Sequence, residues 1–270
     1  MRIATLRVDG TTKAALRDGD KYRLLDFEDV GALIRANVDW SRLQGSREIE
    51  LNQADYAPTI LEPRKIFCLG LNYREHIAEM GRADAGYPTL FCKFAQTLMG
   101  ANDDLVLPAI SQAVDWEAEL GVVIKDETRN VSESEANDHI AGFVVVNDVS
   151  MRDFQNRTTQ FMQGKIFEGT TPVGPELVTP DEVDFARDLR ITTTIDGEVM
   201  QDSRTSRLIF SIPEVISYIS SIITLSPGDL ISTGTPSGVG AGRVPKVFLK
   251  SGQRLVTTVE GVGELVNLVR

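Results

Sequence analysis

The sequence predicts a strand-rich α+β fold built on a mixed, largely antiparallel sheet. Short apolar or alternating runs outnumber the helical patches, and the two kinds do not alternate as they do in a doubly wound fold. A chain of 270 residues is long enough for one large domain with a small appendage. With 42% hydrophobic and 25% charged residues, it has the composition of an ordinary globular protein.

The first 60 residues are expected to form a small N-terminal β/α appendage. The runs at residues 2–8 and 22–25 border Asp-Gly turn signals, which predicts an antiparallel meander. A helix is predicted over residues 27–37, and residues 55–64 contain two prolines, which favours an extended linker. We therefore expect a small N-terminal domain at residues 1–60 and a main domain at residues 61–270.

Strand signals dominate the main domain. Helices are predicted at residues 73–80, at residues 132–138, which open with a capping box, and at residues 212–221, with a proline just inside the start. The predicted strands are residues 65–69, 89–94, 105–107, 117–124, 142–148, 189–195, 230–233 and 255–259.

Charge and cysteine content limit the partners and the compartment. A net charge of −11 argues against nucleic acid or an anionic membrane as the partner, because the field of the protein would repel both. The N-terminus lacks a signal-peptide pattern, and no apolar run approaches the roughly 20 residues that span a bilayer, so a cytoplasmic protein is expected. Cys68 and Cys92 lie in apolar contexts, and we expect both to be buried and reduced.

Acidic residues in two apolar runs are candidate metal ligands. Asp115, Glu117 and Glu119 share one face of a predicted strand by its period of two, and Asp148 ends a second apolar run. Buried like charges are costly unless a cation joins them, and hard divalent ions prefer oxygen ligands. A solvated acidic face explains the same spacing, and on spacing alone it is the stronger interpretation.

The two histidines differ in context. His76 and Glu79 lie three residues apart on a predicted helix, so the carboxylate can hold the imidazole as a general base. A surface pair is the more common outcome for such spacing. His139 lies in a polar connection and is expected to be an ordinary surface residue.

Basic residues and a glycine-rich segment could meet an anionic ligand. Lys93, Arg152 and Lys165 lie in or beside apolar stretches, where each is as consistent with a snorkelling surface residue as with a site residue. Residues 231–242 lack the Gly-Lys-Ser/Thr of a nucleotide loop. This segment could instead present backbone N–H groups and the hydroxyl of Thr235 to a carboxylate or enolate oxygen, and a plain glycine-rich turn is equally consistent.

Together, six segments resemble the fumarylacetoacetate hydrolase superfamily, in order along residues 60–270: LGLNYREHIAEMG, DWEAELGVVI, GFVVVNDVSMRDFQ, GKIFEGTTPVGP, LSPGD and STGTPSGVG. The resemblance implies a mixed β-roll of the family's C-terminal type and a homodimer. The region before residue 60 is far shorter than the N-terminal domain of the animal-type members. This favours the short bacterial or acylpyruvase-like branch.

The resemblance also implies roles for the candidate residues. One divalent cation, Mg²⁺ or Mn²⁺ with Ca²⁺ as a further option, would be bound by Glu117, Glu119 and Asp148. The residues similar to the family's catalytic groups are His76 and Glu79, a water-activating or proton-shuttling dyad, and Lys165, which stabilises developing negative charge. The implied substrate-binding residues are Lys93, Arg152, Gln155, Gly234 and Thr235.

The function expected from this site is metal-dependent hydrolysis of a C–C bond in a small anionic β-diketo acid, of the acylpyruvate or fumarylpyruvate type, through a pyruvate enolate. An oxaloacetate decarboxylase or a 2-oxo-acid hydratase or isomerase would use the same site, because these reactions share the enolate. A non-catalytic ligand-binding scaffold is the third alternative, and buried like charges argue against it.

Overall fold

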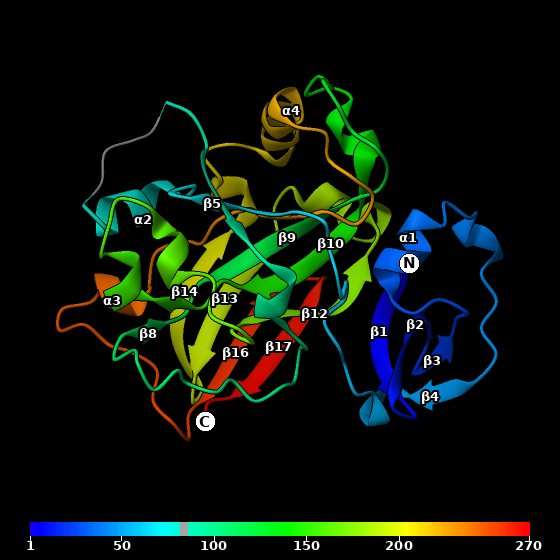
Figure 1. Ribbon diagram of the computed structural model, residues 1–270, viewed down its shortest axis with the longest axis horizontal. Helices are drawn as coiled ribbons and strands as arrows, with labels where there is room; N and C mark the ends of the chain where they lie inside the picture. The colour runs from blue at the N-terminus through cyan, green and yellow to red at the C-terminus, as the bar shows by residue number, and fades with distance from the viewer. Residues whose placement is uncertain (82–85) are drawn as a thin grey trace.

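The computed structural model describes residues 1–81 and 86–270, and these form a strand-rich α+β fold (Figure 1). Most strands of its large sheet pair antiparallel, whereas β5 pairs with β15 and β7 with β12 in parallel. The order across this sheet is β4 (Glu48–Glu50), β3 (Lys21–Leu24), β2 (Thr11–Asp18), β1 (Arg2–Val8), β12 (Thr171–Val178), β10 (Ile140–Asn147), β9 (Ala118–Ile124), β15 (Leu230–Ser232), β5 (Ile66–Gly70) and β6 (Thr89–Lys93), with β7 (Leu98–Met99) beside β12.

Two smaller sheets and four α-helices complete the described fold. A four-stranded sheet, in the order β14 (Glu198–Arg204), β13 (Arg190–Ile195), β16 (Arg254–Val259) and β17 (Gly263–Leu268), packs against β9 and β10. A two-stranded sheet pairs β8 (Val114–Asp115) with β11 (Ser150–Met151). The helices are α1 (Val30–Arg35), α2 (Arg74–Glu79), α3 (Arg152–Gln155) and α4 (Ile212–Ile222).

Short 3-10 segments connect these elements. They are Trp40–Arg42, Leu51–Gln53, Ala95–Thr97, Ala136–His139, Phe161–Gly164, Pro180–Glu182, Asp184–Ala186, Thr205–Arg207 and Gly240–Gly242. Figure 1 shows β1 to β4 and α1 at one end of the molecule and α2 and α3 at the other. The candidate site residues on α2 and α3 therefore lie at the opposite end of the molecule from the N-terminal strands (Figure 1).

The N-terminal strands continue the large sheet. Strand β1 pairs with β12, with Ile3 opposite Leu177. Ile3 and Leu33 are fully buried in one apolar cluster with Val144 and Leu177. The division at residue 60 stays a prediction about chain organisation, because strand pairing and core packing both cross it.

Most predicted elements are present, and two are wrong. Residues 105–107 form only an isolated bridge, between Leu105 and Val269. In residues 132–138 the capping contact forms, with the amide of Ser132 donating to Glu135 Oε2 over 3.0 Å, but only a 3-10 segment follows. Strand β10 begins at Ile140, which leaves no room for a longer helix.

Two expectations about single residues need correction. Cys68 and Cys92 are both free, as expected, but Cys92 is only half-buried. His139 is not an ordinary surface residue, because its side chain is 23% exposed and its Nδ1 lies 2.5 Å from Asp126 Oδ1. None of the helices in the described residues is long and apolar enough to cross a membrane.

Candidate metal centre and active site

Neighbouring strands bring three carboxylates together. Strands β9 and β10 pair with Glu119 opposite Val146, and the amide of Asp148 donates to the carbonyl oxygen of Glu117 over 2.9 Å. One oxygen each from Glu117, Glu119 and Asp148 lies within 4.8 Å of the others. All three residues are at most 4% exposed, so the interpretation as a solvated acidic face is wrong.

Asp115 does not belong to this cluster. The expectation of a single strand carrying three acids on one face is wrong, because β8 ends at Asp115 and β9 begins at Ala118. The carboxylate of Asp115 contacts Arg152 and backbone amides of residues 240 and 241 instead. The period of two still holds for Glu117 and Glu119.

Three buried basic side chains contact two of the acids. Lys165 Nζ lies 2.6 Å from Glu117 Oε2 and 2.8 Å from Asp148 Oδ2. Lys93 Nζ lies 2.6 Å from Asp148 Oδ1, and Arg152 Nη1 lies 2.7 Å from Glu117 Oε1. Burial acts to raise the pKa of Glu117, but Lys165 and Arg152 lower it to about 2. Burial likewise acts to lower the pKa of Lys165, and the carboxylates of Asp148 and Glu117 raise it.

Glu119 has a different environment. Its Oε2 accepts hydrogen bonds from the hydroxyl of Ser232 and from the amide of Gly234, the latter over 2.9 Å, and both donors are neutral. Burial, followed by the charges of Asp148 and Glu117, raises the pKa of Glu119 well above its ordinary value. A divalent cation would offset the repulsion between these buried carboxylates, and a set of carboxylate oxygens suits Mg²⁺ or Mn²⁺. The residues at the site therefore fit such an ion.

A histidine–carboxylate pair lies on α2. His76 Nδ1 is 3.1 Å from Glu79 Oε2, and Glu79 Oε1 accepts a hydrogen bond from the amide of Gly238 over 2.9 Å. Because an ionised carboxylate only accepts, Nδ1 is the donor and Nε2 keeps a lone pair. His76 is 5% exposed, so the pair is not a surface pair.

One narrow cavity is lined by His76 and by two of the acids, Glu117 and Glu119. Its free volume is about 40 Å³, which is room for one or two water molecules. The polar residues lining it are His76, Glu117, Glu119, Arg152, Gln155, Asn156, Lys165 and Thr235, and the others are Leu69, Gly70, Leu71, Met80, Phe91 and Phe161. Lys93 and Gly234 contact the acids instead of lining this cavity.

Several lining residues were missed from the sequence. Phe91 precedes Lys93 by two on β6, so the period of a strand could have placed it on the same face as that candidate lysine. Leu71 has a φ of +60°, an unusual backbone conformation for leucine that is enriched at functional sites. Phe161 lies in a 3-10 segment without a comparable sequence signal.

Known proteins resemble this chain along most of its length. The family model described as fumarylacetoacetate (FAA) hydrolase C-terminal matches residues 65–270. Mitochondrial oxaloacetate tautomerase FAHD2A of Bos taurus is 40% identical over 220 residues, which cover 81% of this chain and 70% of that protein.

Solved structures cover the chain completely. Fumarylacetoacetate hydrolase from the psychrophile Exiguobacterium antarcticum has a TM-score of 0.89 and 30% identity, and the match covers 100% of this chain and 99% of that one. A 5-carboxymethyl-2-hydroxymuconate delta-isomerase from Mycobacterium smegmatis has a TM-score of 0.83 and 30% identity, with the same coverage. The names of these relatives span three reaction types.

Proposed function

Because the chain belongs to the fumarylacetoacetate hydrolase family, we propose that it is a divalent-metal-dependent enzyme that interconverts a small 2-oxo acid and its enol. The observation that carries this proposal is His76, which Glu79 orients on the wall of a cavity that Glu117 and Glu119, two of the three clustered acids, also line. A base beside a charge-stabilising centre is what proton transfer at the carbon next to a carbonyl requires. The name of the bovine relative supports the same reaction class.

Glu117, Glu119 and Asp148 are the proposed ligands of the cation, Mg²⁺ or Mn²⁺. A cation held by these residues would supply Lewis-acid stabilisation of negative charge on a substrate oxygen, typically worth several kcal/mol. The raised pKa of Glu119 supports this assignment, because a bound cation would stabilise the ionised carboxylate that burial and the neighbouring acids disfavour.

His76 is the proposed acid and base. Its Nε2 takes a proton from carbon 3 of the 2-oxo acid, and the electron pair of that C–H bond forms the C2–C3 double bond. The 2-oxo oxygen gains the negative charge and takes a proton from solvent to give the enol. Lys165, held in the charged state by Glu117 and Asp148, stabilises the oxygen while it is negative.

The substrate is proposed to be a small 2-oxo dicarboxylic acid, such as oxaloacetate. Arg152 Nη2 is buried without a hydrogen-bond partner among the described residues, so this guanidinium can still donate to a substrate carboxylate. Gln155 and Thr235 line the same cavity and are proposed to contact the substrate. Lys93 and Gly234 are proposed to act through Asp148 and Glu119, which they contact.

Hydrolysis of an acylpyruvate is the second candidate. The same dyad can take a proton from water as that water adds to a remote carbonyl, and the similar structure from Exiguobacterium antarcticum is named as a hydrolase. Decarboxylation of oxaloacetate needs no base at His76, which distinguishes it from both. We also retain the proposal of a homodimer, which the family resemblance implies, and a cytoplasmic location stays a separate proposal.

An assay of three reactions tests this proposal. In the first assay, the purified protein with Mg²⁺ or Mn²⁺ is mixed with the enol form of oxaloacetate, and loss of the enol is measured by its absorbance. Release of pyruvate from oxaloacetate and cleavage of an acylpyruvate are measured in parallel. We expect enol loss above the uncatalysed rate, and about a 10²- to 10⁴-fold decrease in His76→Gln. Glu117→Ala should abolish the part of the enol-loss rate that depends on the metal ion.

Other outcomes identify the alternatives. Pyruvate release that survives His76→Gln would indicate a decarboxylase. Acylpyruvate cleavage without faster enol loss would indicate a hydrolase. If no reaction were accelerated and Glu117→Ala changed nothing, the enzymatic proposal would be wrong.

A further inference from the structure

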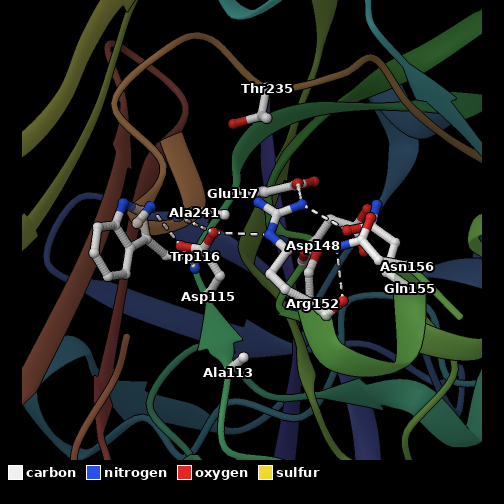
Figure 2. Close-up of polar contacts among 12 residues, drawn as sticks. Ala113, Asp115, Trp116, Glu117, Asp148, Arg152, Gln155, Asn156, Thr235 and Ala241 are labelled. Atoms are coloured by element: carbon white, nitrogen blue, oxygen red, sulfur yellow. Dashed lines mark hydrogen bonds and ion pairs between the residues drawn. The ribbon is translucent and has the colours of Figure 1, made fainter. Parts of the chain in front are cut away.

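Asp115 is a fully buried carboxylate outside the metal cluster. Its Oδ1 accepts hydrogen bonds from the amides of Gly240 over 2.7 Å and Trp116 over 2.9 Å. Its Oδ2 accepts from the amide of Ala241 and from Arg152 Nε, over 2.9 and 2.8 Å. Figure 2 shows Asp115 between Ala241 on one side and the guanidinium of Arg152 on the other.

The glycine loop, residues 234–242, reaches from Asp115 to the catalytic base. The amide of Gly238 donates to Glu79 Oε1 over 2.9 Å, and the carbonyl oxygen of Gly238 accepts from Trp116 Nε1 over 3.2 Å. A Cβ on Gly242 would lie 2.4 Å from side-chain carbons of Glu79, so this loop lies directly against that carboxylate. Loop position therefore sets the position of Glu79.

Arg152 connects Asp115 to the acid cluster. Its Nη1 lies 2.7 Å from Glu117 Oε1 and 2.9 Å from Gln155 Oε1 (Figure 2). The base on α2 and Glu117, which directly precedes β9, come from separate segments of the chain. Asp115 contacts both the loop that holds the base and the arginine that holds an acid.

We propose that Asp115 is a positioning residue that couples the glycine loop, and through it the Glu79–His76 pair, to the Arg152–Glu117 ion pair. This inference rests on the proposed function for its kinetic test, whereas its structural test does not need activity. A displacement of about 1 Å between base and substrate can cost roughly 100-fold in rate. Asp115 fixes this separation without touching the substrate.

The kinetic test is a double-mutant cycle with Asp115→Asn and Glu79→Gln. Asp115→Asn keeps the side-chain volume but turns an N–H donor towards groups that are themselves donors, so we expect kcat to fall about 10- to 100-fold. Because both residues act on His76, kcat of the double variant should be no more than about threefold lower than kcat of Glu79→Gln alone. Losses that multiply instead would overturn the proposal.

Asp229→Asn is the matched control. Asp229 is also fully buried, accepts from the amides of Lys65 over 2.9 Å and Ser226 over 2.7 Å, and lies 2.8 Å from Lys65 Nζ. It contacts neither α2 nor the glycine loop through these bonds. We expect Asp229→Asn to lower stability, to leave kcat unchanged and to combine additively with Glu79→Gln.

Hydrogen exchange tests the coupling without activity. The amides of Ile77 and Met80 donate to backbone carbonyls at α2, and the amides of α4 serve as an internal reference. In Asp115→Asn we expect the ratio of the α2 exchange rates to the α4 exchange rates to rise above that of wild type. In Asp229→Asn this ratio should not change. If the exchange rates in α2 relative to α4 were unchanged in Asp115→Asn, the proposal would be wrong. This test remains valid even if none of the assayed reactions were catalysed and the proposed function were wrong. If Asp115→Asn did not fold, Trp116→Phe, which removes the indole N–H donated to Gly238 together with part of a fully buried ring, would carry both tests with smaller changes in the same direction.

Discussion

Glu119 is the residue whose environment points most clearly to a missing charge. Its two acidic neighbours are compensated by lysine and arginine side chains, whereas its own hydrogen-bond donors are neutral. Burial and the like charges of Asp148 and Glu117 raise its pKa, so they disfavour the ionised form of this carboxyl. Such strongly shifted groups cluster at functional sites.

Replacement of Glu119 should separate stability from metal binding. In ion-free protein, Glu119→Gln should melt at the same temperature as wild type or higher, because burying a neutral amide costs neither the uptake of a proton nor a charge beside Asp148 and Glu117. At an ion concentration of 100 Kd, binding contributes about 2.7 kcal/mol. In a chain of this size that is roughly 5–10 °C in Tm. In calorimetry, Mn²⁺ should raise the Tm of wild type by this amount and should not raise the Tm of Glu119→Gln.

A surface acid provides the control for this substitution. Glu50→Gln changes an acid on β4 whose side chain is 50% exposed, and it should keep the full Mn²⁺ increment. If Glu119→Gln gained as much from Mn²⁺ as wild type, Glu119 would not be a ligand.

The sequence predicts the acid cluster better than its surroundings. The period of two places Glu117 and Glu119 on one face, and the apolar run before Asp148 indicates burial. The separate position of Asp115 could not be predicted, because long-range contacts to Arg152 and to residues 240 and 241 direct its side chain. Local spacing carries no information about such contacts.

Among the elements, the glycine loop has the tightest steric limits. A Cβ on Gly240 would lie 1.8 Å from the carbonyl oxygen of Val247 and 2.9 Å from Asp115 Oδ1. Gly240→Ala should therefore displace the loop from Asp115 and Glu79 and lower kcat by about tenfold or more, measured by steady-state kinetics.

Gly252→Ala controls for the loss of a glycine elsewhere. Gly252 has a φ of +91°, and a Cβ added there would meet no atom within 4 Å, so alanine at this position costs only backbone strain, about 1–2 kcal/mol. The Gly252→Ala variant should have a lower Tm than wild type and an unchanged kcat. A Gly240→Ala variant with wild-type kcat would contradict the role given to the loop.

Strand prediction failed where the local signals conflict with the fold. Strand β12 contains Pro172, Gly174 and Pro175, and local propensity alone argues against a strand with these residues. Pairing with β10 and β1 on its two sides overrides that preference. Strand β14 was detectable, since Asp196 and Gly197, with φ of +52° and +86°, form the hairpin turn before it.

At the scale of the whole molecule, one continuous sheet joins the N-terminal strands to the site. The family supports several reactions on this fold, since proteins named as a tautomerase, a hydrolase and an isomerase all resemble the chain. Reaction type therefore depends on residues around the cavity, while the sheet provides the rigid support.

Removal of residues 1–60 tests how far the N-terminal region folds separately. Truncation would leave β12 without its partner β1 and would expose Val144 and Leu177, which are now fully buried. We expect residues 61–270 alone to lose cooperative thermal unfolding and to associate, as measured by circular dichroism and size-exclusion chromatography. A monodisperse fragment with a cooperative transition and an unchanged Mn²⁺ increment would show that this region is dispensable.

The most direct test of enolate formation at this site is deuterium incorporation at carbon 3 of oxaloacetate in D₂O, followed by proton NMR. The proposed chemistry predicts incorporation faster than the uncatalysed rate with Mg²⁺ or Mn²⁺, lost when the ion is chelated and lost in His76→Gln. Incorporation at the uncatalysed rate, or acceleration that depends on neither the ion nor His76, would contradict it.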